Sequence, residues 1–292
     1  MEGPEDKGNK SLRDAVLATV VWFDVFGYPL TLPEVARYLP VGGGLKGVSL
    51  SDVAAMLDSS EFSCGDGYYS LKDGKGASVL RQRRYRLAKR KLGRARRAAS
   101  LFGLMPSVRL VAVCNSLAVS NAEEGSDIDL FVVCRPGTLW ATRFALAGTL
   151  KLFGLRPTPE EQKDKLCLSF WVSESEMDLS RYALPGGDPY MDFWIATLMP
   201  LYDAGGVFDE FRKVNEVGRS EGRKVGNGSG RIERLAKRIQ MRKFPERIRA
   251  MANLDSRVVV SDDVLKFHVN DRRAVFRGRF REKLDSLNVK EI

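Results

Sequence analysis

The stretch "CNSLAVSNAEEGSDIDLFVVC", residues 114–134, contains the pattern that decides the fold. Asp127 and Asp129 stand one residue apart, directly before the apolar run Leu-Phe-Val-Val. On a strand, residues i and i+2 point to the same face, so these carboxylates are expected to project together while Ile128 enters the core. Asn115 and Ser116 come about ten residues earlier, after a second apolar run. The pattern predicts two buried strands, with the carboxylate pair where the second one begins.

The residues around this stretch alternate between strand and helix patterns. We expect a strand that turns into a helix start at 108–118, a helix at 139–154 and a third strand at 166–173. Residues 190–203 form an apolar, aromatic segment that we expect to pack against them. The predicted fold class is α/β (α+β), a mixed sheet with helices, in a central domain over residues 106–216.

The remaining chain divides into four parts. Residues 1–76 read as three helices and a hairpin around Gly-Asp-Gly, which resembles a winged helix-turn-helix. A basic connecting helix is expected within 77–105, where six residues at helical spacing form an apolar stripe (Tyr85, Ala88, Leu92, Ala95, Ala99, Phe102). Residues 217–230 are rich in glycine and read as a linker, and residues 231–292 as a basic helical C-terminal region.

The positive charge of the chain is concentrated in one segment. The net charge is +10, and residues 80–97 hold ten Lys and Arg without any acid, so that 37 basic and 37 acidic residues remain elsewhere. A localised basic stripe favours a polyanionic partner such as RNA. Basic side chains that cover an apolar surface in solvent are the alternative. The candidates for nucleic-acid binding are Arg81, Arg83, Arg84, Arg86, Arg90, Arg94 and Arg97.

The cysteines and the histidine exclude some kinds of site. The four cysteines show no CxxC spacing, so we interpret them as reduced, small apolar residues of a cytoplasmic protein. The single histidine, His268, leaves little material for a zinc site or a catalytic triad and is expected to be packed or on the surface. No uncharged apolar run near the N-terminus is long enough to cross a bilayer, so no membrane partner is expected.

These residues resemble the polymerase-β-type nucleotidyltransferase superfamily. Its signature is a hydrophobic strand, Gly with Gly or Ser, a gap of about ten residues and Asp-hydrophobic-Asp, which corresponds here to "LVAVCNS" and "DIDLFVV". The match covers residues 108–134, and the next helix and strand fit in order to about residue 172. The wider layout is similar to bacterial and archaeal proteins in which a helical N-terminal module precedes this core.

The resemblance implies an enzyme that moves a nucleoside monophosphate from an NTP to an acceptor. Asp127 and Asp129 would hold Mg²⁺ or Mn²⁺ and act as the catalytic residues. Asn115, Ser116 and Ser126 would contact the nucleotide, with Ser116 at the start of a helix whose free amides face the phosphates. RNA, a protein or a small molecule would be the acceptor.

Two positions depart from the family pattern. Asn115 stands where a glycine is expected; asparagine tolerates positive φ, but its side chain would occupy space near the phosphates. The third carboxylate is also not evident: Ser169 stands where the family pattern has it, and Glu174 and Asp164 are the alternatives. These departures keep a second hypothesis open, a catalytically degenerate fold that acts as a nucleic-acid-binding or regulatory protein.

Overall fold

The computed structural model describes residues 4–39, 47–72, 77–216 and 230–289. The chain forms two compact units, which we describe separately. The first unit comprises Met1–Tyr85 and Arg272–Ile292, and the second comprises Arg86–Asp271. Both combine helices with sheets, as expected for an α+β protein. Nearly all of the predicted linker at 217–230 lies outside the described residues.

The first unit packs helices against a small antiparallel sheet. Its helices are α1 (Pro4–Asp24), α2 (Leu32–Arg37), α3 (Leu50–Leu57) and α11 (Arg273–Ser286), and its strands are β1 (Leu30–Thr31), β2 (Phe62–Gly65) and β3 (Tyr68–Leu71), in the order β1-β3-β2. The predicted hairpin is β2–β3. Asp66 and Gly67 both have positive φ at its tip, as a two-residue hairpin turn of this type requires.

The C-terminal residues do not form the single helical region that we expected. Helix α11 belongs to the first unit, where Phe280 packs edge-on against Trp22 and Lys283 pairs with Asp24 at 2.6 Å. Residues 231–271 belong to the second unit and contain α9 (Arg231–Lys243), α10 (Glu246–Met251) and the short strands β8 (Val258–Val260) and β9 (Val264–Phe267). These strands are too short for their periodicity to stand out in a basic sequence.

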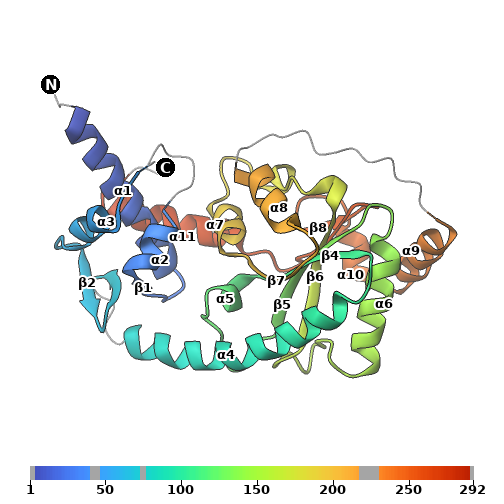
Figure 1. Ribbon diagram of the computed structural model, residues 1–292. Coiled ribbons are helices and arrows are strands. Elements are labelled where there is room, and N and C mark those ends of the chain that lie inside the picture. Colours follow the sequence, from blue (N-terminus) through green and yellow to red (C-terminus); the bar gives the residue numbers. More distant parts are fainter. Residues whose placement is uncertain (1–3, 40–46, 73–76, 217–229, 290–292) are drawn as a thin grey trace. The chain divides into compact units, whose positions relative to one another are not determined.

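A six-stranded mixed sheet is the centre of the second unit (Figure 1). Its strand order is β7-β4-β5-β6-β9-β8, and the four strands not yet introduced are β4 (Val108–Val113), β5 (Ile128–Cys134), β6 (Leu166–Ser173) and β7 (Met199–Asp203). Strands β5 and β6 are parallel, and all other neighbours are antiparallel. The predicted strands at 108–113, 128–134 and 166–173 therefore lie side by side.

Helices cover both faces of this sheet. One face packs against α4 (Ala77–Phe102), α6 (Leu139–Leu152) and α9, and its largest buried side chains include Trp140 and Trp171. The other face packs against α7 (Pro189–Thr197) and α8 (Val207–Glu216), where Trp194 and Phe211 contact Phe131. The apolar segment at 190–203 supplies α7 and the edge strand β7.

The apolar stripe of α4 is buried with one exception. Ala88, Leu92, Ala95, Ala99 and Phe102 lie in the core, whereas Tyr85 is 54% exposed. Tyr85 ends the N-terminal segment of the first unit, so it lies outside the core that covers the rest of the stripe. In the parts of the chain that the structure describes, no helix combines the length and the apolar character that spanning a membrane requires.

Candidate functional site

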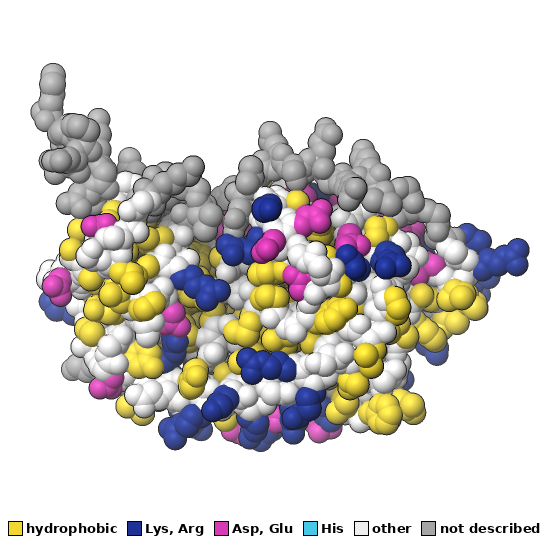
Figure 2. All heavy atoms as spheres, viewed as in Figure 1, with side chains coloured by type: hydrophobic (Ala, Val, Ile, Leu, Met, Phe, Trp, Pro, Cys, Tyr) yellow, Lys and Arg dark blue, Asp and Glu magenta, His cyan; other side chains and the backbone are white. Residues whose placement is uncertain are grey.

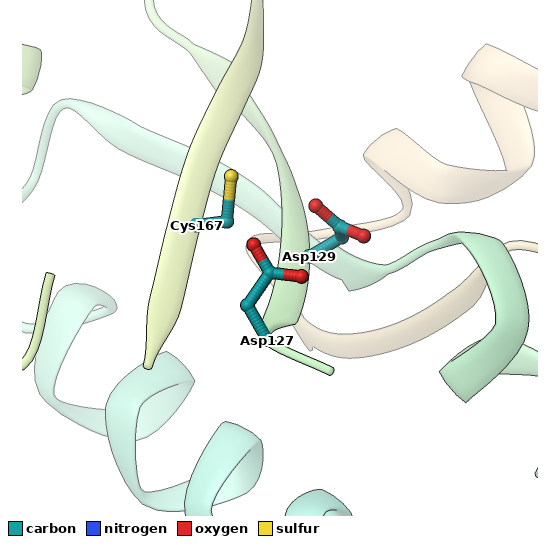
Figure 3. A group of neighbouring side chains, drawn as sticks. All are labelled: Asp127, Asp129 and Cys167. Carbon is teal, nitrogen blue, oxygen red and sulfur yellow. The ribbon is translucent and has the colours of Figure 1, made fainter. Parts of the chain in front are cut away.

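The parallel pairing of β5 and β6 brings Asp127, Asp129 and Cys167 together (Figure 3). Asp129 and Cys167 are direct partners in the sheet register, and Asp127 precedes Asp129 by two residues on the same side. One carboxylate oxygen from each aspartate and the cysteine sulfur all lie within 4.8 Å of one another. This group can hold a metal ion.

An irregularity in β6 adjoins Cys167. From Asp129 to Phe131 the strand β5 advances two residues, while β6 advances three residues from Cys167 to Phe170. An extra residue of this kind bends a strand and re-aims its side chains, and such bulges are frequent beside active sites. Here the extra residue lies between Cys167 and the aromatic core. Ser169 approaches the Nε2 of His268 at 3.5 Å, and the ring of His268 meets Phe170 edge-on.

Asn115 connects the turn after β4 to the carboxylate pair. Its φ of 57° confirms that the position of the expected glycine requires a left-handed backbone, which asparagine tolerates. Its amide nitrogen donates to Asp129 at 2.7 Å, and its carbonyl oxygen accepts from Trp194 at 3.1 Å and from Tyr190 at 3.3 Å. The side chain is therefore held against Asp129 by α7, a role that we did not predict.

The pKa values of both aspartates are raised. Burial, and secondly the charge of Asp127, raise the pKa of Asp129 from 3.8 to about 6, against the hydrogen bonds from Asn115 and Cys167. Burial likewise raises the pKa of Asp127, against hydrogen bonds and the positive charge of Lys91. The carboxylates disfavour each other's ionised form. A divalent cation between them would favour it.

Lys91 supports the loop that leads into β5. Its side chain is fully buried, and its Nζ pairs with Asp164 at 2.9 Å and donates to the carbonyl oxygens of Ser126 and Glu124. The backbone amide of Asp164 also donates to the carbonyl oxygen of Ser126, at 3.1 Å. These contacts fix the residue directly before Asp127. Lys91 is thus a buried basic residue of α4 that holds the loop directly before Asp127.

Neither Glu174 nor Asp164 joins the carboxylate pair. Asp164 faces α4, where Lys91, Arg90 and Arg94 surround it, and these charges lower its pKa although burial opposes them. Glu174 follows β6 at the opposite end from Cys167 and pairs with Arg109 at 2.8 Å. Neither of these two alternatives for a third carboxylate ligand is therefore part of the group that the described residues form around Asp127 and Asp129. The third member of the group is Cys167.

The two serines differ from their expected roles. Ser116 is exposed in α5 (Asn115–Ala118), a single turn of four residues, so the expected helix dipole is small. Ser126 uses its hydroxyl to close a turn by donating to the carbonyl oxygen of Glu123 at 3.0 Å. Ser116 thus stays available at the surface beside Asn115, whereas Ser126 has a structural function.

Apart from Lys91, the basic residues of α4 fall into two groups. Arg81 is buried in the first unit, where it pairs with Glu34 at 2.6 Å and stacks on Tyr28, and Arg84 is half-buried and donates to the carbonyl oxygen of Phe26 at 3.4 Å. These two are therefore not part of an open binding surface. The exposed group comprises Arg83, Arg86, Lys89, Arg90, Arg94, Arg96 and Arg97. Figure 2 shows basic side chains along the lower edge of the view, over α4.

Sequence reasoning missed several residues of the site. Cys167 was interpreted as a small apolar residue, and the contacts of Tyr190 and Trp194 with Asn115 were not predicted. His268 is packed against Phe170, in line with the expectation of a packed or surface residue. The spacing of Trp194 from Tyr190, four residues on a helix, could have indicated a shared face. No pattern in the sequence indicates which residue they meet.

Comparisons of the chain with protein-family models, curated proteins and solved structures found no match. A functional assignment therefore depends on the geometry of the site itself.

Proposed function

We propose that the protein is a metal-dependent nucleotidyltransferase that moves a nucleoside monophosphate from an NTP to an acceptor. The observation that supports this proposal is the convergence of Asp127 and Asp129 beside the turn at Asn115, with a direct hydrogen bond from Asn115 to Asp129. Residues from the ends of two antiparallel neighbouring strands thereby form one polar site.

The donor set suits a divalent cation that also binds phosphate. Mg²⁺ takes one or two carboxylates from a protein and fills its other positions with water and substrate phosphate oxygens. Asp127 and Asp129 offer such a pair. Burial raises the pKa values of both, with the charge of Asp127 adding to the effect on Asp129, and a bound cation would favour their ionised forms. When bound, Mg²⁺ or Mn²⁺ would neutralise triphosphate charge and act as a Lewis acid at the α-phosphate.

The chain itself contributes positioning. In this proposal Asn115 holds Asp129 in one orientation, and Lys91 fixes the loop before Asp127, so the carboxylates are placed before substrate arrives. Ser116, exposed next to Asn115, contacts the phosphates through its hydroxyl. The acceptor oxygen would attack the α-phosphorus, the bond from phosphorus to the bridging oxygen would break, and pyrophosphate would leave with that electron pair.

RNA is the acceptor class that the charge favours. In the second unit, Arg86, Lys89, Arg90, Arg94, Arg96 and Arg97 are exposed on the same helix whose Lys91 supports the site. A row of cations binds a phosphate backbone without sequence preference and with strong salt dependence. A protein side chain or a small molecule would not need this surface, and both are outcomes of the test below.

The test is incubation of the full chain with each α-labelled NTP and Mg²⁺ or Mn²⁺, with and without RNA. The proposal expects label transfer by the wild type and its loss in Asp127→Asn and Asp129→Asn. Asp255→Asn is the matched control, because Asp255 is an exposed aspartate paired with Arg257 and should leave transfer unchanged. Transfer that continues in both site variants, or no transfer under any of these conditions, would contradict the proposal.

A nucleic-acid-binding protein without catalysis is the second candidate. Cys167 in place of a third carboxylate and the fully engaged side chain of Asn115 favour it. It predicts salt-sensitive RNA binding that persists in Asp127→Asn and Asp129→Asn, together with no transfer by the wild type. Loss of RNA binding when Arg86, Arg94 and Arg97 are replaced by Gln would assign that binding to α4.

A further inference from the structure

We propose that Cys167 is a third ligand of the cation site, so that the site prefers thiophilic cations of the Co²⁺ and Zn²⁺ type to Mg²⁺. This inference rests on the same cation site as the proposed function, although it does not depend on nucleotide transfer. The proposed ligand atom is the sulfur of Cys167, which is not part of the Asp127–Asp129 pattern in the sequence.

The position of the sulfur carries the inference. Cys167 is the register partner of Asp129 on a parallel strand, so the backbone holds both side chains on one side of the sheet. The sulfur and one oxygen of each aspartate lie within 4.8 Å of one another. Zn–S and Zn–O bonds of about 2.3 and 2.1 Å place tetrahedral donors about 3.5 Å apart, so small side-chain rotations suffice to close the site.

The other three cysteines do not lie in the group with the two carboxylates. Cys114 directly follows β4, and its backbone amide donates to the carbonyl oxygen of Asp129, but its side chain lies in the core cluster with Phe131 and Trp194. Cys134 is fully buried at the far end of β5. Cys64 is exposed in the first unit. Cys167 alone among the described cysteines is both partly accessible and grouped with the carboxylates.

The chemistry of the donors sets the preference. As a metal–sulfur bond forms, the thiol proton passes to solvent and the thiolate donates an electron pair to the cation. Mg²⁺ is a hard cation that prefers oxygen, whereas affinity for mixed oxygen and sulfur donors rises from Mn²⁺ through Co²⁺, and Zn²⁺ is well suited to thiolate. Two carboxylates and one thiolate leave at least one position open for water or a phosphate oxygen.

Titration of the full chain with Co²⁺ tests the assignment, because cobalt–thiolate coordination produces an intense near-ultraviolet charge-transfer band. We expect the band with one equivalent of Co²⁺ in the wild type, in Cys64→Ser and in Cys114→Ala, and its loss in Cys167→Ser. Calorimetry should show that Cys167→Ser weakens Co²⁺ and Zn²⁺ binding at least about tenfold, since outer-shell changes alone cost 10- to 100-fold. Its Mg²⁺ affinity should change little.

A second measurement uses only the wild type, so its result does not depend on whether Cys167→Ser folds. The ¹¹³Cd resonance of the cadmium-loaded wild type should lie in the range of sites with one thiolate. An all-oxygen ¹¹³Cd shift, the absence of the Co²⁺ band at saturation, or a band that persists in Cys167→Ser would overturn the inference. Label transfer with no sulfur ligation would leave the proposed function standing, and sulfur ligation with no transfer would leave only the metal site.

Discussion

In the absence of metal, replacing Asp129 by Asn should make the protein more stable at neutral pH. The wild type must keep two adjacent, partly buried carboxylates ionised when it folds, and Asn removes one of these charges. The pKa of Asp129 is about 6 in the folded chain against 3.8 for the free group. At 1.36 kcal/mol for each pH unit, this difference corresponds to about 3 kcal/mol, an upper bound because Asp129 is only partly buried and solvent screens its charge.

The gain should depend on pH in a defined direction. A carboxyl group with a raised folded-state pKa binds its proton more tightly when folded, so ionisation lowers stability as pH rises. The penalty is absent below pH 3.8, grows between pH 3.8 and about 6, and is complete above that range. Urea denaturation in EDTA from pH 4 to 8 should therefore give equal stabilities at pH 4 and the largest difference above pH 6.

Metal should reverse the order of stability. A cation at 100 times its dissociation constant stabilises the native state by about 2.7 kcal/mol, and Asp129→Asn should lose most of this effect. Asp255→Asn is the control, since Arg257 lowers the pKa of that exposed aspartate and its replacement should give no gain. A site variant that is no more stable than wild type in EDTA at pH 7.5, or a gain independent of pH, would refute the reasoning.

Substitutions at three further positions are tested by urea denaturation, two at residues that support the site and one at the start of α6. Lys91→Met should destabilise the fold by about 3–5 kcal/mol, because it leaves the largely buried Asp164 without its main partner. The control Lys89→Met, on the exposed side of α4, should change stability by less than about 0.5 kcal/mol. Equal effects of the two substitutions would contradict the role of Lys91. Asn115→Gly should lower the free energy of unfolding by about 1–2 kcal/mol, because its hydrogen bonds are lost. Asn115→Ala should lower it by about 1 kcal/mol more, because alanine is strained at the positive φ of this position. A larger effect of Gly than of Ala would exclude this backbone strain. Glu233→Ala should cost about 1–2 kcal/mol, because Glu233 accepts the amides at the start of α6, and an unchanged midpoint would contradict this.

Patterns within single elements could be predicted from the sequence. Apolar runs indicated the strands at 108–113, 128–134 and 166–173, and the i, i+2 rule placed Asp127 and Asp129 on one side of β5. The turn at Asn115 was also predictable, since positive φ is a local property and asparagine is a residue that adopts it. These features depend on residues that are close in sequence.

Other features required contacts between distant segments. Ten basic residues in one helix look equivalent in sequence, yet Arg81 and Lys91 are buried in ion pairs while Arg86 and Arg94 are exposed. The strands β8 and β9 were not predicted, because such short strands form only where they can pair with an existing strand, here β6. The division of the C-terminal residues between two units likewise follows from which apolar faces they cover.

The sequence alone determined that two carboxylates project together from the start of a buried strand, because side-chain direction alternates along any strand. Only the tertiary structure decided their companions. Parallel pairing of β5 with β6 set Cys167 beside Asp129, and packing of α7 turned Asn115 toward the same carboxylate. Strand order and helix packing depend on the burial of the whole apolar surface, which no local pattern of residues encodes.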